Sequence, residues 1–296
     1  MKNDGTSYRI KLISGGRGFV FSSDIGENAD TDAYIIEDGL DGFDSPPIEV
    51  KLSSYGALEG GYVEKRRYGE RELTIAAELR GEGAEAEARR NRLVSMLDTV
   101  SDCVLETELY GVRRRISVVP AGECRFTRGI LGGRVTVELS LLAPGVFFED
   151  SAERTVVFRS LAPALTFPLN SMKSAGFVSG VYRTTTDAEA DNPGDAECGF
   201  TVVINADGGQ IVNPGIECGG AHVRCPVTLE DGGTLVISTV PRHKTVTLNG
   251  EKYRGFDADS VFFSLPRGKN KVSVICDSGG EYVRASLSFT PLYCGA

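Results

Sequence analysis

The sequence predicts a mainly β protein of two domains with a single helix. Its 296 residues suit two domains of roughly 150 residues each. Its 36 glycines, against only 3 methionines, favour a chain with many turns and few helices. In several segments apolar and polar residues alternate strictly, which is typical of strands that bury one face in an antiparallel sheet.

The clearest alternation lies at 73–79, 135–141 and 283–289, and each segment is predicted to be a strand with one buried face. Asn249-Gly250 follows the apolar segment Thr245–Leu248 and suits a tight hairpin turn. Pro266-Arg267-Gly268 precedes a predicted strand at 271–276. The polar, acidic segment 184–197 is predicted to be a loop because it lacks such alternation.

Segment 82–100 has a different pattern. Leu93, Val94 and Leu97 recur at helical spacing, and Glu85 stands four residues before Arg89, a favourable pair on a helix. We predict one structural helix of roughly 14 to 16 residues that packs against a sheet.

A domain boundary is predicted where Pro144-Gly145 ends a strand and Val146-Phe147-Phe148 follows. We assign residues 1–149 to the first domain and 150–296 to the second, and we allow the last strand to return to the first domain.

Charge and cysteine content exclude several classes of protein. The net charge of −9 argues against a broad basic face for nucleic acid, so no sequence-specific nucleic-acid partner is expected. Seven scattered cysteines favour a reduced protein made in the cytoplasm rather than a disulfide framework. We expect neither a signal peptide nor membrane insertion, because no sufficiently long apolar segment is present.

Catalytic and metal-binding patterns are weak. Cys218, His222 and Cys225 superficially offer zinc ligands, but on a single strand His222 and Cys225 would point to opposite faces. No Gly-x-Ser-x-Gly elbow or Walker loop is present. Carboxylates such as Asp38 and Asp41 precede glycines, which is typical of loops, so their pairing in the sequence does not indicate a catalytic pair of acids. We predict no enzymatic activity, no metal and no cofactor.

Opposite charges are segregated in the first domain. Residues 24–49 hold nine acids and no Lys or Arg, whereas residues 113–134 hold six arginines and one acid, Glu123. Three interpretations are open. The two segments form solvated faces, or they contact each other within the domain, or they meet between neighbouring copies of the chain. The candidate subunit-interface residues are Arg66, Arg67, Arg71, Arg113, Arg114, Arg115, Asp30, Asp32 and Asp38.

A series of motifs resembles one known family. The first is Gly60-Gly61-Tyr62-Val63-Glu64-Lys65-Arg66-Arg67-Tyr68-Gly69-Glu70-Arg71-Glu72-Leu73-Thr74-Ile75, followed by the helix and by Ala143-Pro144-Gly145-Val146-Phe147-Phe148. The second half adds Phe167-Pro168-Leu169, Asn192-Pro193-Gly194-Asp195, Asn213-Pro214-Gly215, Pro266-Arg267-Gly268-Lys269-Asn270 and a terminal Pro291-Leu292-Tyr293. In this order the motifs resemble the distal tail proteins of siphophages, the phage tail family of baseplate hub subunits. The second proline that the family usually has before the aromatic pair is absent.

The resemblance implies a hexameric ring at the tip of a phage tail. The first domain would be a β-sandwich or split barrel with one helix that forms the ring around the DNA channel, and the second a galectin-like β-sandwich. The implied partners are other copies of the chain, the tail tube protein, the tail-associated hub protein, and receptor-binding or baseplate proteins. The location would be the virion. The acidic and arginine-rich segments would then be candidates for head-to-tail contact between copies.

A carbohydrate-binding adhesin is the alternative, because galectin-like sandwiches suggest sugar binding. Sugar sites commonly use an aromatic platform, ideally tryptophan, and this chain has none. Tyr182 and Tyr253 are the remaining candidate platforms. A tail-tube subunit is a third interpretation, but such proteins usually lack a second sandwich of this kind.

Overall fold

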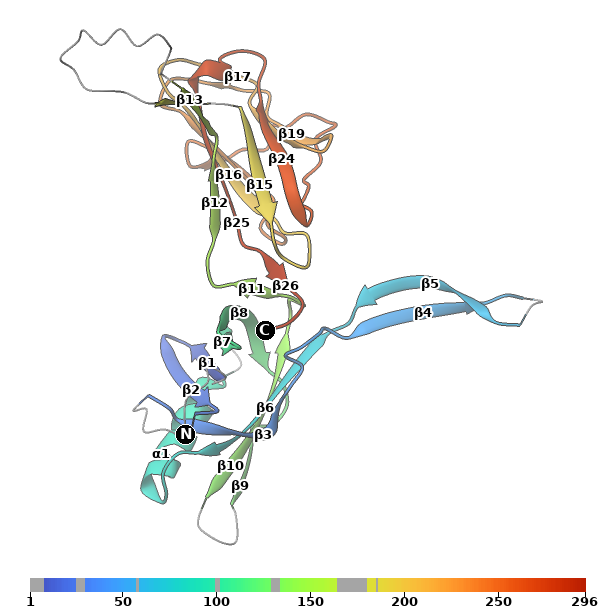
Figure 1. Ribbon diagram of the computed structural model, residues 1–296, viewed down its shortest axis with the longest axis vertical. Coiled ribbons are helices and arrows are strands. Elements are labelled where there is room, and N and C mark those ends of the chain that lie inside the picture. The colour runs from blue at the N-terminus through green and yellow to red at the C-terminus, as the bar shows by residue number, and fades with distance from the viewer. Residues whose placement is uncertain are drawn as a thin grey trace, which may run out of the picture. The chain divides into compact units, whose positions relative to one another are not determined.

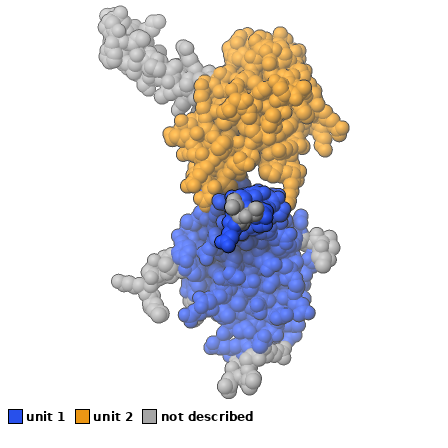
Figure 2. All heavy atoms as spheres, turned by 90° about the vertical axis from the view of Figure 1, so that its right-hand side faces the viewer, with its two compact units in different colours: residues 1–151, 292–296 blue, residues 152–291 orange. Residues whose placement is uncertain are grey.

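The computed structural model describes residues 8–24, 30–56, 59–98, 102–128, 134–163, 180–184 and 186–296, with the backbone alone described at 159–163 and 180–184. The chain divides into two compact units (Figure 2). Unit 1 comprises residues 1–151 and 292–296, and unit 2 comprises residues 152–291. The Phe167-Pro168-Leu169 motif lies outside the described residues.

Unit 1 is built around a sheet that closes on itself (Figure 1). The strands follow the order β8-β7-β1-β2-β3-β6-β10, and β10 pairs again with β8 at Leu141↔Pro120. The flanking strands β26 and β11 extend the sheet at one end, and β9 extends it at the other. The strands are β1 (Arg9–Ser14), β2 (Arg17–Ser22), β3 (Ala33–Asp41), β6 (Arg71–Leu79), β7 (Cys103–Leu109), β8 (Val112–Pro120), β9 (Arg125–Arg128), β10 (Val135–Ala143), β11 (Phe148–Asp150) and β26 (Leu292–Tyr293).

Alternation in the sequence decides which residues form the core of this barrel. Leu73, Ile75 and Ala77 on β6 are buried and face Leu141, Leu139 and Val137 of β10 across the ladder. Phe19, Phe21 and Leu12 join the same core. The predicted strands at 73–79 and 135–141 are thereby confirmed.

The predicted helix is also present. Helix α1 (Ala84–Met96) buries Ala86, Leu93 and Met96 in the barrel core. Arg89 contacts Glu85 at 3.3 Å, as the spacing predicted. Val94 was expected in the buried stripe but is 47% exposed, because the helix turns the adjacent Leu93 inward instead.

Unit 2 is a β-sandwich of two sheets. The six-stranded sheet has the order β12-β25-β16-β21-β22-β23, and the four-stranded sheet has the order β15-β24-β18-β19. Two short pairs, β13–β14 and β17–β20, complete the unit. The strands are β12 (Arg154–Val157), β13 (Arg159–Pro163), β14 (Gly180–Thr184), β15 (Asp187–Asn192), β16 (Phe200–Ala206), β17 (Ile211–Val212), β18 (Gly215–Cys218), β19 (Ala221–Arg224), β20 (Thr228–Leu229), β21 (Thr234–Ser238), β22 (Thr245–Leu248), β23 (Glu251–Lys252), β24 (Gly268–Ile275) and β25 (Val283–Phe289). A one-turn 3-10 helix, Gly280–Tyr282, precedes β25.

The predicted turn at Asn249-Gly250 is confirmed. Both residues have positive φ, 51° and 86°, and Leu248 pairs with Glu251 across the turn. The predicted strands at 271–276 and 283–289 are present as β24 and β25. The mainly β, two-domain fold class that the sequence predicted is therefore correct.

The loop predicted at 184–197 is wrong in part, because β15 occupies Asp187–Asn192. Its outward carboxylates are matched across the ladder: Asp187 lies 3.1 Å from Lys271, and Glu189 lies 2.8 Å from Lys269. Its inward positions are small or polar, such as Ala190, so the apolar alternation that reveals a strand is missing.

Candidate assembly surfaces

Strands β4 (Ile48–Ser54) and β5 (Gly61–Tyr68) form a separate hairpin that we call the arm. The arm pairs with no other strand of the described chain, and Figure 1 shows it projecting from the body of unit 1. Of the sixteen large apolar side chains exposed in the described residues, seven lie in the arm. These seven are Ile48, Val50, Leu52, Tyr55, Tyr62, Val63 and Tyr68. This concentration marks the arm as an interaction element rather than ordinary surface.

The two faces of the arm differ in chemistry. Residues paired across a ladder share a face, so the pairs Ile48–Tyr68, Val50–Arg66 and Leu52–Val63 form an apolar face that carries one arginine. On the other face Glu49 accepts a hydrogen bond from Arg67 at 2.6 Å.

The charged face also holds a small polar network. Glu64 accepts hydrogen bonds from Ser53 at 2.6 Å and from Lys51 at 2.9 Å. These bonds, that from Ser53 first, lower the pKa of Glu64. Most polar groups of the charged face are therefore paired within it, whereas the apolar face is left exposed to solvent.

The arginines at 113–115 find partners within their own chain. Arg113 lies 3.2 Å from Glu108, and Arg115 lies 3.0 Å from Glu149. Arg114 points the other way and stacks on the ring of Tyr293, 3.9 Å from its centroid, while donating to the carbonyl of Gly295. None of these partners belongs to the acidic segment 24–49.

The outward faces of β1, β7 and β8 carry these charges as a ladder. Lys11, Glu106 and Arg115 lie side by side in register on adjacent strands, and Arg9, Glu108 and Arg113 repeat the pattern in the next row. The two rows hold four basic and two acidic side chains, so this part of the arginine-rich segment lies on a surface of mixed charge with a small positive excess.

Arg71 is not a surface residue, and its prediction as an interface residue was wrong. Its side chain is 0% exposed. Nε donates to the carbonyl of Gly42 at 2.9 Å, Nη1 donates to the carbonyl of Val146 at 2.7 Å, and the guanidinium lies 4.7 Å from the ring centroid of Phe148. Burial lowers the pKa of Arg71. The residue ties the start of β6 to two neighbouring loops.

Asp32 is likewise buried, so its prediction as an interface residue was also wrong. Its carboxylate accepts a hydrogen bond from the amide of Val20 at 3.0 Å and forms ion pairs with Arg89 and Arg92 of the helix. It fixes α1 to the barrel. Asp30 and Asp38, in contrast, are exposed, and Asp38 has a positive φ of 55°.

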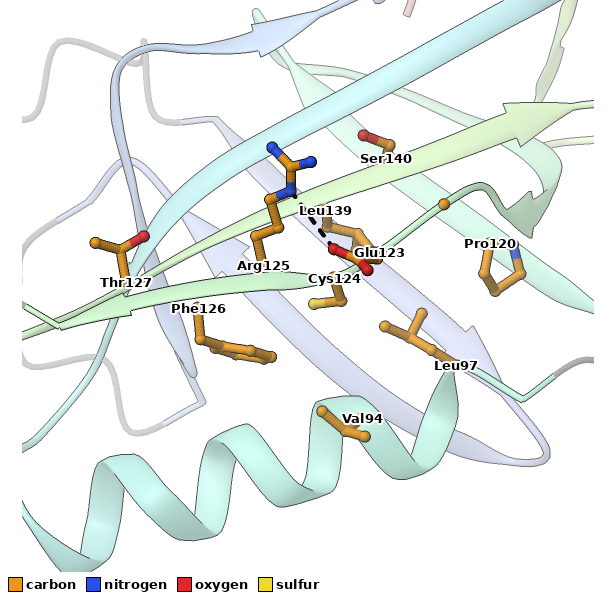
Figure 3. Close-up of a pocket in the computed structure, with 11 residues that line it drawn as sticks. Val94, Leu97, Pro120, Glu123, Cys124, Arg125, Phe126, Thr127, Leu139 and Ser140 are labelled. Atoms are coloured by element: carbon orange, nitrogen blue, oxygen red, sulfur yellow. Dashed lines mark ion pairs between the residues drawn. The ribbon is translucent and has the colours of Figure 1, made fainter.

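A groove lies between α1 and β9 in unit 1 (Figure 3). It has a volume of about 550 Å³, and its apolar lining comes from Val94 and Leu97 of the helix side, Phe126 of β9, and Pro120 and Leu139 of the barrel. Burial raises the pKa of the Cys124 thiol in this lining to about 11. On the rim, Glu123 and Arg125 form a long, exposed ion pair at 3.8 Å.

The residues considered as metal ligands or sugar platforms have other contacts. His222 lies 3.5 Å from Asp259, and Cys225 is buried. Within the described ranges, no three His, Cys, Asp or Glu side chains are grouped as ligands for a metal. Tyr253 donates its hydroxyl to the carbonyl of Pro226 at 3.2 Å, and the Tyr182 side chain lies outside the described residues. Across the described chain, no helix has the length and apolar character needed to cross a bilayer.

Residues 193–293 match the family of the siphovirus-type tail component, C-terminal domain. This region is similar to siphovirus tail components. The predicted resemblance to siphophage distal tail proteins is therefore confirmed over this region, and the matched family is one of phage tail components. A search of curated protein sequences finds no significant match.

Solved structures resemble the whole chain. The Dit protein of phage SPP1, described as a paradigm of the hub adsorption apparatus in phages that infect Gram-positive bacteria, matches with a TM-score of 0.65 at 14% identity, covering 96% of this chain and 98% of that one. At this identity the match shows a common fold. Chains of the phage p2 baseplate in its activated conformation match with TM-scores of 0.46 with calcium and 0.44 with strontium, each at 10% identity; they cover 96% of this chain and 98% and 97% of those chains.

Several motif residues in or next to the matched region have structural roles. Asn192 is 0% exposed and donates to the carbonyls of Ala196 and Leu265, at 3.0 and 3.1 Å. Its own carbonyl accepts from the amide of Gly194, which closes the Asn-Pro-Gly turn. Asn270 similarly donates to three backbone carbonyls. These motif residues therefore stabilise the loops of unit 2 and do not form a binding site.

Sequence reasoning missed the apolar face of the arm. The signal was present: Ile48, Val50 and Leu52 alternate with charged or polar residues, as in a strand with one apolar face.

Proposed function

We propose that this chain is the subunit of a hexameric distal tail ring that joins the tail tube to the baseplate and host-adsorption apparatus around the DNA channel. The observation that carries the proposal is the siphovirus-type tail domain at 193–293, together with the fold shared with the SPP1 Dit protein, whose description names a hub adsorption apparatus. The ring subunit is a structural rather than an enzymatic component. It is synthesised in the bacterial host cytoplasm and assembled into the tail tip.

The arm supports a role in assembly. A two-stranded hairpin alone is marginally stable in water, and this one also exposes a row of large apolar side chains. Contact with another protein surface would both stabilise the hairpin and bury these apolar side chains. Among the candidate interface residues, Arg66 and Arg67 lie on the arm, and Asp30, Asp38, Arg113 and Arg115 lie on the surface of unit 1; these remain proposed subunit contacts.

The partners follow from the position of such a ring. We expect other copies of the chain, a tail tube protein on one side and a tail-associated hub protein on the other, with receptor-binding or baseplate proteins further out. The net charge of −9 suits a channel subunit that DNA must pass without being retained.

The decisive experiment is to purify the full chain, measure its mass by light scattering and image it by negative-stain electron microscopy. We expect rings of six copies with a central channel. A closed dimer with two-fold symmetry would contradict the proposal, because its self-complementary interface leaves no free surface to extend into a ring.

A further inference from the structure

The structure contains an exposed apolar element and a groove with several apolar side chains in the same unit. The apolar face of the arm presents Leu52, which is 67% exposed, and Ile48, which is 66% exposed. The groove between α1 and β9 is lined by apolar and polar side chains in similar measure, and Val94 at its edge is 47% exposed. In this chain neither surface covers the other.

The open strand edges of β9 and of the arm also suit contact between these two surfaces. Strand β9 is the last strand of its sheet and pairs only with β10 among the described strands, so one edge of β9 carries unpaired amides and carbonyls. Each arm strand also has one open edge. An arm strand laid along β9 would extend the sheet by strand addition and place alternate side chains toward the groove.

Charged side chains stand at the margins of both surfaces, and the groove rim carries Arg125 as well as Glu123. Arg66 is the one cation among the ladder pairs of the arm's apolar face, and it forms no ion pair with the described residues of its own chain. On the groove rim, Glu123 has only a long contact with Arg125, and both side chains are largely exposed. An arm placed with its apolar face in the groove brings an arginine to a rim that offers a carboxylate.

We infer that the arm of one copy docks into the α1–β9 groove of a second copy, with Leu52 near Val94 and Arg66 near Glu123. The two contacting surfaces lie on different parts of the chain, so the contact is head-to-tail and leaves each copy with one free arm and one free groove. The inference rests on the proposed function, since repetition of this contact closes the ring.

Cysteine cross-linking between two single variants tests the contact. Leu52→Cys is mixed with Val94→Cys in the full chain, and a short bismaleimide joins thiols that lie close together. Only a contact between copies yields the mixed dimer. The matched control replaces Val94→Cys by Val157→Cys, because Val157 in unit 2 is also 47% exposed. All variants also carry Cys124→Ser, because Cys124 lines the groove and would itself react with a docked Leu52→Cys. The Cys124→Ser chain alone measures the background from the other native cysteines.

We expect the Leu52→Cys and Val94→Cys mixture to yield at least about tenfold more dimer than the control, because docked thiols meet at a high effective concentration. Equal yields would overturn the inference. If negative stain shows rings but the two cross-linking yields are equal, this contact is wrong and the ring proposal still holds. An excess of dimer in a preparation that forms no ring would support the contact and count against the ring.

A charge exchange gives a second readout without new thiols at the contact. Arg66→Glu is expected to reduce association of copies in light scattering, and the double variant Arg66→Glu with Glu123→Arg is expected to restore it. Both positions are exposed, so neither substitution should unfold the protein. If Arg66→Glu weakens association but the double variant does not restore it, Arg66 has a different partner. That result would overturn this placement of the arm.

Discussion

Replacing Arg71 by methionine should strongly destabilise unit 1, although the side chain keeps a similar length. The guanidinium is buried, donates to the carbonyls of Gly42 and Val146, and lies over the ring of Phe148. Methionine can fill the space and contact the ring, but it donates no hydrogen bond. Two carbonyl oxygens would then be left without these charged donors.

The size of the effect follows from these groups. A hydrogen bond from a charged group contributes about 1.5–3 kcal/mol, so loss of two costs about 3–6 kcal/mol. Methionine avoids the desolvation of a buried cation, which offsets part of that loss. We expect the free energy of unfolding of unit 1 to fall by about 2–4 kcal/mol.

Hydrogen exchange measured by mass spectrometry suits this test, because a two-unit chain need not unfold in one transition. Peptides from β6 and β10 report on unit 1, and peptides from β16 and β25 report on unit 2 within the same sample. Arg66→Met is the matched control: it is the same substitution at an exposed arginine of the preceding strand. A loss below about 0.5 kcal/mol in Arg71→Met, or an equal loss in the control, would refute the reasoning.

Three further substitutions test other contacts. Asn192→Ala removes hydrogen bonds donated to two carbonyls and should destabilise unit 2 by about 2–3 kcal/mol in the same exchange assay; an unchanged unit 2 would contradict this. Asp277 has a lowered pKa because it accepts hydrogen bonds from Asn213 and Arg224, so its stabilising effect relative to Asp277→Asn should be present above about pH 4 and lost as the pH falls further. Denaturation curves of both proteins at about pH 7 and pH 3 check this, and a stability difference of the same size at both pH values would argue against it. Arg114→Ala should release β26, seen as faster amide exchange in the C-terminal segment with unit 2 unchanged.

Local patterns were sufficient to predict the helix and some of the strands. Strands β6, β10 and β25 followed from alternation, α1 from helical spacing, and the β22–β23 turn from Asn249-Gly250. These signals are local because side-chain periodicity and turn geometry are set by neighbouring residues. Strand β15 failed the same test, since its ladder is held by lysines of β24 that stand far away in the sequence.

The candidate site was harder to predict, because exposure of a charged residue depends on tertiary structure. Arg66 and Arg71 stand in one basic motif, yet one is on the exposed arm and the other is completely buried. Likewise Asp32 was grouped with exposed acids but fixes the helix through Arg89 and Arg92. Composition and spacing carry no information on which loop carbonyls or helix will face a given charge.

The topology of unit 1 restricts where another copy can attach through its backbone. Closure of β8 on β10 joins the ends of a seven-strand ring and removes the edges that an open sheet would present. Among the described strands of unit 1, the open edges that remain belong to β9, to β26 and to the arm. Strand β26 is only Leu292–Tyr293 and is held in place by Arg114, so it offers a short edge. The arm and β9 are then the two longest edges available, and the arm also carries the largest group of exposed apolar side chains. An assembly that buries apolar surface and pairs open edges at the same time must therefore use the arm, and β9 is the edge on which an arm can be both paired and covered.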